Sequence, residues 1–141
     1  MNKSLIHAWM VALTLSLLLN ACGDKAEPPA IEKAQQQPLQ QRITELLKKA
    51  DAGDAEAQAD LGEVFASGEG LPKDAAKAAD LFRKSAEKGI ARAQFRLGQM
   101  YVRGEGVPRD AVRAAELIKQ SAVNGYAKAQ TELGAMYARG E

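Results

Sequence analysis

A stretch of nine or ten residues recurs three times in this chain at a fixed interval. The copies LGEVFASGEG, LGQMYVRGEG and LGAMYARGE begin at residues 61, 97 and 133, so successive copies start 36 residues apart. Aligned without gaps, units 55–90 and 91–126 share 17 of 36 residues, and the partial unit 127–141 shares 10 of its 15 residues with the second. Such a period indicates an array of small units that bury their apolar faces by stacking on one another.

Each full unit contains two helical patterns. In both, apolar residues recur at spacings of three and four, the signature of a helix with one buried face. Asp74 and Asp110 precede the second pattern, where a carboxylate can accept hydrogen bonds from the free amides of the first turn. Gly89 and Gly125 follow it, where a helix commonly ends in the left-handed conformation. We therefore expect two helices per unit.

The organisation extends to both sides of the full units. Residues 40–54 match the second half of a unit, because subtracting 36 places Ala50 under Ala86 and Gly53 under Gly89. The prediction is an all-α solenoid of antiparallel helix pairs over residues 40–141, with six helices in a half unit (40–54), units 55–90 and 91–126, and a partial unit (127–141). The glycines that recur inside the first helix of each unit are expected to be packing contacts: Gly62, Gly98 and Gly134.

Two motifs give the array a family likeness. The first is Leu-Gly followed by an aromatic residue, as in Leu97, Gly98 and Tyr101, and the second is Gly-x-Gly-Φ-Pro-x-Asp over 68–74 and 104–110. The combination resembles the Sel1-like repeat family, close kin of the tetratricopeptide repeats, and it covers about residues 41–141. The resemblance implies a solenoid that binds a protein or peptide.

The likeness to tetratricopeptide repeats also implies which residues line the concave groove. Carried over position by position, the polar candidates for partner binding are Glu56, Glu63, Arg92, Gln99, Arg103, Lys128 and Arg139. Phe95 joins them as the expected anchor, because its counterparts Ala59 and Thr131 show that the fold does not require an aromatic residue there. The alternative is that Phe95 fills a local gap. The expected groove grades from acidic at its N-terminal end to basic at its C-terminal end.

The N-terminus reads as an export signal. Lys3 precedes an apolar stretch of about a dozen residues, shorter than the roughly 20 that a membrane-spanning helix needs. Leu19-Asn20-Ala21-Cys22 then resembles the lipobox of bacterial lipoproteins, which implies cleavage of residues 1–21 and acylation of Cys22. More than one acyl chain anchors a protein stably, and Gly23 after the cysteine favours the outer membrane. The alternative is ordinary secretion with a free or buried thiol.

Residues 22–39 are expected to be a lipidated cysteine followed by a flexible tether. The stretch from residue 23 holds three of the five prolines and three consecutive glutamines, and it has no helical apolar period. Such a composition buries too little surface to offset the entropy of ordering. The alternative is an ordered N-terminal arm that packs on the repeats.

Composition excludes several classes of function. Removal of residues 1–21 removes Lys3 and no acidic residue, which leaves 18 basic against 18 acidic residues and no electrostatic footprint for nucleic acid. Cys22 is the only cysteine, so no disulfide framework is expected. The only histidine, His7, lies in the signal, and the carboxylates are scattered. We expect no metal site, no cofactor and no catalytic constellation.

One motif offers an enzymatic alternative. Ser85-Ala86-Glu87-Lys88 spells the Ser-x-x-Lys of penicillin-binding proteins, which would make the chain a peptidoglycan- or β-lactam-binding hydrolase. The companion motifs Ser-Asp-Asn and Lys-Thr-Gly are missing, and Ser121 lacks the lysine at the same register. The serine therefore reads as a small packing residue, and the glycine loops read as turns rather than phosphate cradles.

The favoured interpretation is a lipid-anchored scaffold of the bacterial envelope that is not an enzyme. A second surface is predicted at the C-terminal end, where Leu133, Met136 and Tyr137 face the position of a second helix that the sequence does not contain. Such an uncovered stripe indicates a partner, self-association or a shortened chain.

Overall fold

The computed structural model describes residues 30–140 and places them in six helices. No strand occurs within this range. The helices are α2 (Ala30–Asp51), α3 (Ala55–Ser67), α4 (Ala75–Glu87), α5 (Ala91–Arg103), α6 (Ala111–Val123) and α7 (Ala127–Arg139). The predicted all-α fold with six helices is therefore confirmed. The predicted signal peptide, Cys22 and the first part of the tether lie outside the described residues.

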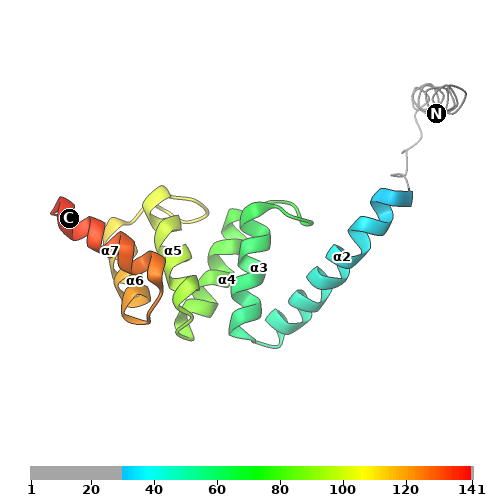
Figure 1. Cartoon of the computed structure of the whole chain (residues 1–141), viewed down its shortest axis with the longest axis horizontal. Coiled ribbons are helices and arrows are strands. Elements are labelled where there is room, and N and C mark those ends of the chain that lie inside the picture. Colours follow the sequence, from blue (N-terminus) through cyan, green and yellow to red (C-terminus); the bar gives the residue numbers. More distant parts are fainter. Residues whose placement is uncertain (1–29, 141) are drawn as a thin grey trace, which may run out of the picture. The chain divides into compact units, whose positions relative to one another are not determined.

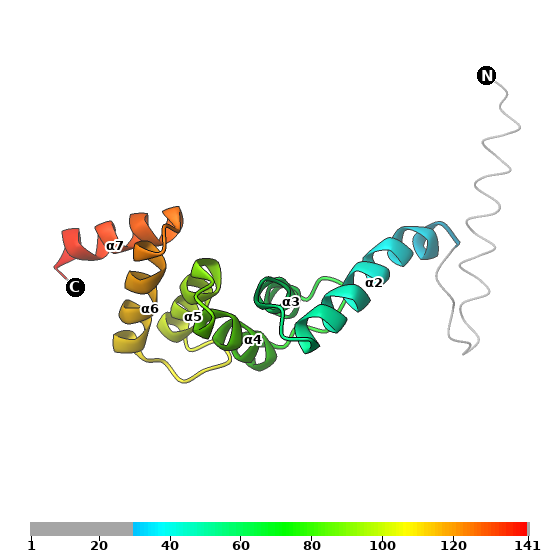
Figure 2. The same cartoon turned by 90° about the horizontal axis from the view of Figure 1, so that it is seen from below.

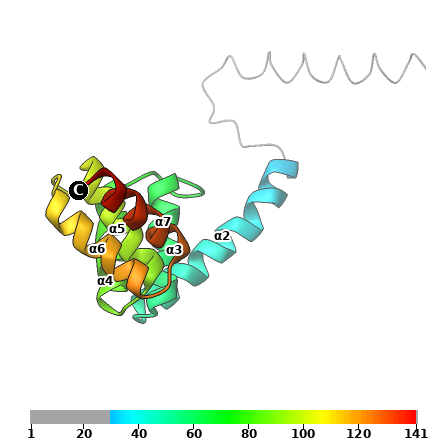
Figure 3. The same ribbon diagram turned by 60° about the vertical axis from the view of Figure 1, so that its left-hand side comes forward.

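The helices pack in the order of the sequence. α3 packs on α4 and α5 on α6 within the two full units, and α4 packs on α5 and α6 on α7 between units (Figure 1). Figure 2 shows the same succession from below, and Figure 3 shows it from the C-terminal side. Residues 36–141 form one compact unit, and the division from the preceding unit falls within α2. Each repeat thus covers the next, as predicted for a solenoid.

The helix before the first full unit is longer than predicted. α2 begins at Ala30, so residues 30–39 are helical and the tether prediction is wrong for this part of the chain. Pro38 lies inside the helix, where a proline removes one backbone hydrogen bond and its ring crowds the carbonyl four residues earlier, but the surrounding alanines, glutamines, lysine and glutamate are strong helix formers. Tertiary contact also favours the helix, because Ile43 is buried and Leu39 is half-buried. Residues 30–39 thus continue the helix of the half unit instead of forming an irregular linker.

Small residues allow the helices of a unit to approach closely. A Cβ added at Gly62 would lie 2.8 Å from the Phe82 ring, and one added at Gly98 would lie 3.0 Å from Ile118. Phe82 is 1% exposed and fills the layer between units together with alanines at positions 78, 79 and 93. The predicted packing role is confirmed for these two glycines. Gly134 differs, because nothing lies within 4 Å of the Cβ position.

Local hydrogen bonds set the ends of the helices. The carboxylates of Asp74 and Asp110 accept from the backbone N–H groups of Lys77 and Arg113, both at 3.0 Å, which confirms the predicted caps. The backbone hydrogen bond from Lys77 lowers the pKa of Asp74. Gly89 and Gly125 both have φ +86, as predicted for residues that end a helix.

The Gly-x-Gly-Φ-Pro loops attach each unit to the one before it. Gly106, with φ +69, passes so close to α4 that an added Cβ would collide with the Ala75 carbonyl. The next residue, Val107, is buried in the core that α4 and α5 share. The loop is therefore a packing turn, which explains its glycines without a bound phosphate.

Candidate partner-binding groove

A ladder of ion pairs joins the first helices of the two full units. Arg92 on α5 reaches back to Asp60 at 2.6 Å and Glu56 at 3.3 Å on α3, and Arg96 reaches Glu63 at 2.6 Å. Burial acts to lower the pKa of Arg92, but the hydrogen bond and charge of Asp60, with Glu56 and Glu63, raise it above its ordinary value. The three acidic side chains at the N-terminal end of the groove are therefore paired within the fold, with two guanidinium groups between them.

Phe95 does not occupy the position predicted for it. Its side chain is only 5% exposed and its ring stacks against Tyr126, with centroids 5.3 Å apart at an interplanar angle of 52°. Tyr126 directly precedes α7, so the ring of Phe95 is covered where the next unit begins. Phe95 forms a small core with Ile118 and Ala129. The expectation that Phe95 anchors a partner is corrected, and the alternative that it fills a local gap fits its place in the fold.

The other candidates at the C-terminal end of the groove remain accessible to different degrees. Arg103 is exposed and lies 3.7 Å from Glu105, a distance at which an exposed pair contributes little. Gln99 is half-buried, and Lys128 and Arg139 are exposed. Lys128 forms no ion pair with any described residue. The positive charges of Arg103 and Lys128 at this end of the groove are thus accessible to a partner.

A crevice recurs once per unit, between the second helix of one unit and the first helix of the next. The first crevice, about 390 Å³, lies between α2 and α3, the middle crevice, about 70 Å³, between α4 and α5, and the third crevice, about 460 Å³, between α6 and α7. The three share a register, because Leu46, Phe82 and Ile118, each 36 residues apart, line them in turn. The aromatic ring of Phe82, the largest of these side chains, lines the smallest crevice.

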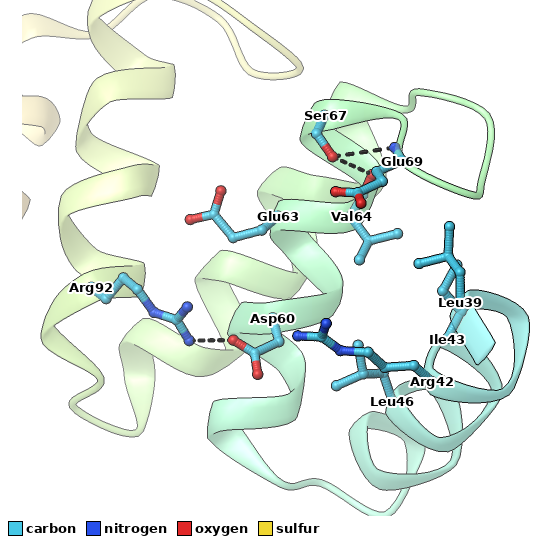
Figure 4. Close-up of a pocket in the computed structure, with 10 residues that line it drawn as sticks. All are labelled: Leu39, Arg42, Ile43, Leu46, Asp60, Glu63, Val64, Ser67, Glu69 and Arg92. Carbon is cyan, nitrogen blue, oxygen red and sulfur yellow. Dashed lines mark hydrogen bonds and ion pairs between the residues drawn. The ribbon is translucent and has the colours of Figure 1, made fainter. Parts of the chain in front are cut away.

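The first crevice combines an apolar wall with charged side chains (Figure 4). Leu39, Ile43, Leu46 and Val64 supply the apolar part. Arg42 and Arg92 project toward Asp60 from opposite sides, with only the Arg92 contact marked as a bond. An aliphatic side chain flanked by polar groups on an extended segment fits such a lining, since ligand pockets commonly pair apolar walls with a few placed polar groups.

Sequence reasoning missed four residues of this region. Asp60 and Arg96 complete the ion-pair ladder, and Arg42 and Glu69 line the first crevice. The ladder has a sequence signal, because opposite charges lie 32 and 33 residues apart, close to one repeat length. Arg42 and Glu69 carry no comparable signal, since their position depends on the path of α2 and of the first glycine loop.

Ser85, the serine of the Ser-x-x-Lys motif, is a structural residue. It is fully buried, and its hydroxyl donates to the Ala55 carbonyl at 2.7 Å. Ser121 makes the same bond to Ala91 at 2.6 Å in the next unit. Lys88 contacts the Gly53 carbonyl instead of the serine. The motif therefore fixes the second helix of a unit to the first, and its hydroxyl is out of reach of a β-lactam.

The predicted stripe at the C-terminal end is only partly uncovered. Leu133 and Met136 are half-buried and pack against the core of Phe95 and Ile118, so for them the expectation is corrected. Tyr137 is 66% exposed. α6 covers one side of α7, and the side that carries Tyr137 remains open.

The described part of the chain holds neither a metal-ligand cluster nor a membrane-spanning helix. Within residues 30–140, no group of three or more histidine, cysteine, aspartate or glutamate side chains is placed to hold a metal ion. None of the helices in the described part combines the length and the apolar character that crossing a bilayer requires.

Comparison with known proteins identifies the family. The Sel1 repeat model matches residues 55–90, 91–126 and 127–141, more than half of the chain and in the same register as the units above. The chain therefore belongs to the Sel1 repeat family, whose members are mostly not enzymes and generally mediate protein–protein interactions. No curated protein sequence matches the chain.

Solved structures give the same result. The chain is 40% identical, with a TM-score of 0.66 over 70% of its length, to a protective antigen of uropathogenic Escherichia coli strains that displays an SLR fold. It is 34% identical, with a TM-score of 0.68 over 72% of its length, to a Sel1 repeat protein from Oxalobacter formigenes. The match spans only 21% and 41% of those chains.

A more distant structure shares the fold alone. Helicobacter pylori cysteine rich protein B is 22% identical, with a TM-score of 0.63, over 67% of this chain and 71% of its own.

Proposed function

We propose that this chain is a lipid-anchored adaptor of the bacterial cell envelope that binds a protein or peptide along its first helices. The ion-pair ladder is the observation that carries the proposal. It fixes α3 against α5 and pairs the three carboxylates of the acidic end with two guanidinium groups, so the positive charge that a partner can reach is that of Arg103 and Lys128. We therefore propose a partner segment with acidic residues near α5 and α7 and an aliphatic side chain near the first crevice.

The proposal is tested by reversing charge on one face at a time. The groove variant Arg103→Glu with Lys128→Glu is expected to weaken the affinity for the co-purifying partner at least tenfold, a loss of about 1.4 kcal/mol in binding free energy. The matched variant Lys84→Glu with Lys119→Glu makes the same charge change at exposed positions of the second helices and is expected to retain the partner. Equal retention by both variants, with unchanged circular dichroism, would rule the groove out.

Anchoring is a separate part of the proposal and rests on the lipobox-like Leu19-Asn20-Ala21-Cys22. Acylation of Cys22 would hold the repeats at the membrane. The proposed site is the periplasmic side of the outer membrane. Cys22→Ser removes the acceptor thiol, so the variant is expected to move from the membrane fraction to the soluble envelope fraction or to remain unprocessed. A Cys22→Ser protein that fractionates and migrates like the parent chain would show that lipid on this residue is not the anchor.

Self-association through Leu133, Met136 and Tyr137 is a further part of the proposal. Only Tyr137 of the three is well exposed, so a contact between copies would depend chiefly on that ring.

A further inference from the structure

The side chains that line the first crevice are shorter than those of the middle crevice. The two crevices share a register, so their lining residues can be compared position by position. The first crevice has the shorter side chain at four positions, which are Leu46 against Phe82, Asp60 against Arg96, Val64 against Met100, and Ser67 against Arg103. Only Leu39 is longer than its counterpart, Ala75. The residue types of the first crevice thus keep about 390 Å³ open, whereas those of the middle crevice leave about 70 Å³.

The carboxylate of Glu69, at one side of the first crevice, lacks the partner that its counterpart has. In the second unit, Glu105 lies 3.7 Å from the guanidinium of Arg103. In the first unit, Ser67 stands at the register of that arginine, and the Glu69 carboxylate forms no ion pair with any described residue. The negative charge of Glu69 is therefore available to a cationic group of a ligand.

Arg42 on α2 is a second charged residue of the crevice that has no ion-pair partner. It is exposed and forms no ion pair within residues 30–140. Figure 4 shows it pointing toward Asp60, whose carboxylate is already bound by Arg92 at 2.6 Å. The same register carries the buried Ala78 and Ala114 in the full units, so packing between units does not require a cation there. The guanidinium of Arg42 is therefore available to an anionic group of a ligand.

These two charges lie toward opposite ends of the apolar wall. Glu69 follows the C-terminal end of α3, whereas Arg42 points toward Asp60, nearer the N-terminal end of the same helix (Figure 4). Asp60 and Ser67 are about 10 Å apart along α3, at about 1.5 Å per residue. In an extended peptide, alternate side chains face the same way, and residues i and i+4 lie about 13 Å apart. Such a peptide can place an aliphatic side chain against Val64 and one charge at each end of the wall.

We propose that the first crevice binds an extended peptide segment that carries an aliphatic residue with an acidic residue two positions to one side and a basic residue two positions to the other. The carboxylate pairs with Arg42, the aliphatic side chain lies against Val64, and the cation pairs with Glu69. This inference rests on the proposed function and specifies the chemistry of the segment that binds at the N-terminal end of the groove. The groove residues Arg103 and Lys128 do not line the first crevice, so the two proposals can be tested separately.

The test uses the full-length protein in detergent and two fluorescein-labelled peptides with blocked ends. Their sequences are Ser-Asp-Thr-Leu-Thr-Lys-Ser and the reverse, Ser-Lys-Thr-Leu-Thr-Asp-Ser, so both chain directions are sampled. Fluorescence anisotropy is expected to show saturable binding of at least one peptide. Replacing its leucine with serine is expected to raise the Kd at least fivefold, because the apolar contact is lost. The proposal is overturned if neither peptide binds.

Charge reversal at Arg42 tests which end of the peptide it contacts. Arg42→Glu is expected to raise the Kd of the peptide at least fivefold, and a peptide with lysine in place of its aspartate is expected to bind this variant more tightly than it binds the parent protein. Lys48→Glu makes the same charge change at an exposed position of α2 outside the crevice and is expected to leave the Kd unchanged. Equal effects of the two variants would refute the assigned contact.

Filling the crevice tests the apolar contact. Leu46→Phe with Val64→Met introduces the side chains that the middle crevice carries at the same register. This variant is expected to keep its circular dichroism spectrum and to raise the Kd of the peptide at least fivefold. Unchanged peptide binding would overturn the proposal.

The groove variant Arg103→Glu with Lys128→Glu separates this inference from the proposed function. It leaves the lining of the first crevice intact and is expected to bind the peptide as the parent protein does. If this variant loses the co-purifying partner but neither peptide binds the parent protein, the inference fails and the proposed function stands. If the peptide binds as expected but the variant retains the partner, the proposed function fails at Arg103 and Lys128 alone.

Discussion

Replacing Phe82 with alanine is expected to lower the free energy of unfolding by about 3–5 kcal/mol, as for other fully buried aromatic side chains. The ring is 1% exposed and packs on Gly62 between the first and second units. Its loss would leave a cavity where α3, α4 and α5 meet, and glycine at position 62 has no side chain with which to fill it. Urea denaturation followed by circular dichroism measures the change.

The control for Phe82→Ala is another aromatic residue of the array. Tyr137 is 66% exposed, so Tyr137→Ala is expected to change the free energy of unfolding by no more than about 0.5 kcal/mol. Comparable losses from both substitutions would contradict the packing described for α4 and for the open face of α7.

Glycines at the same register of the first helices are expected to respond to substitution with opposite signs. Leucine at position 62 would overlap the Phe82 ring, and overpacking of this kind typically costs about 1–3 kcal/mol. Leucine at position 134 meets open space and replaces a poor helix former, so Gly134→Leu is expected to stabilise the chain by up to about 1 kcal/mol.

Thermal unfolding of the two glycine variants beside the parent chain measures this difference. The expected order of melting temperature is Gly134→Leu above the parent and Gly62→Leu below it. If Gly62→Leu melts at or above the parent temperature, the close approach of α3 and α4 seen here is not the arrangement in solution.

The repeat register made most of the fold predictable. The 36-residue period places every helix of the full units, and the caps at Asp74 and Asp110 and the turns at Gly89 and Gly125 follow from local chemistry that depends on few neighbours. The beginning of α2 was not predictable in the same way. Its composition resembles a linker, and the contacts of Leu39 and Ile43 with the Gly70 loop become visible only in three dimensions.

The candidate site was predictable in its charges but not in its exposure. Glu56, Glu63 and Arg92 lie on the first helices as the family likeness implies. However, Glu56 pairs with Arg92 and Glu63 pairs with Arg96, so these side chains do not remain available. The exposure predicted for Phe95 was wrong because Tyr126, which directly precedes α7, covers the ring. A sequence pattern locates a residue on a helix, whereas exposure depends on the packing of the neighbouring helices.

In-cell photo-crosslinking tests most directly whether the groove is the binding surface. A photoreactive residue is placed at Ser67 or Gln99, which line the first and middle crevices, and at the exposed Arg83 and Lys119 of the second helices as matched controls. A discrete protein adduct is expected from Ser67 or Gln99 and none from Arg83 or Lys119. Adducts of equal yield from both faces, or adducts from the second helices alone, would contradict this expectation.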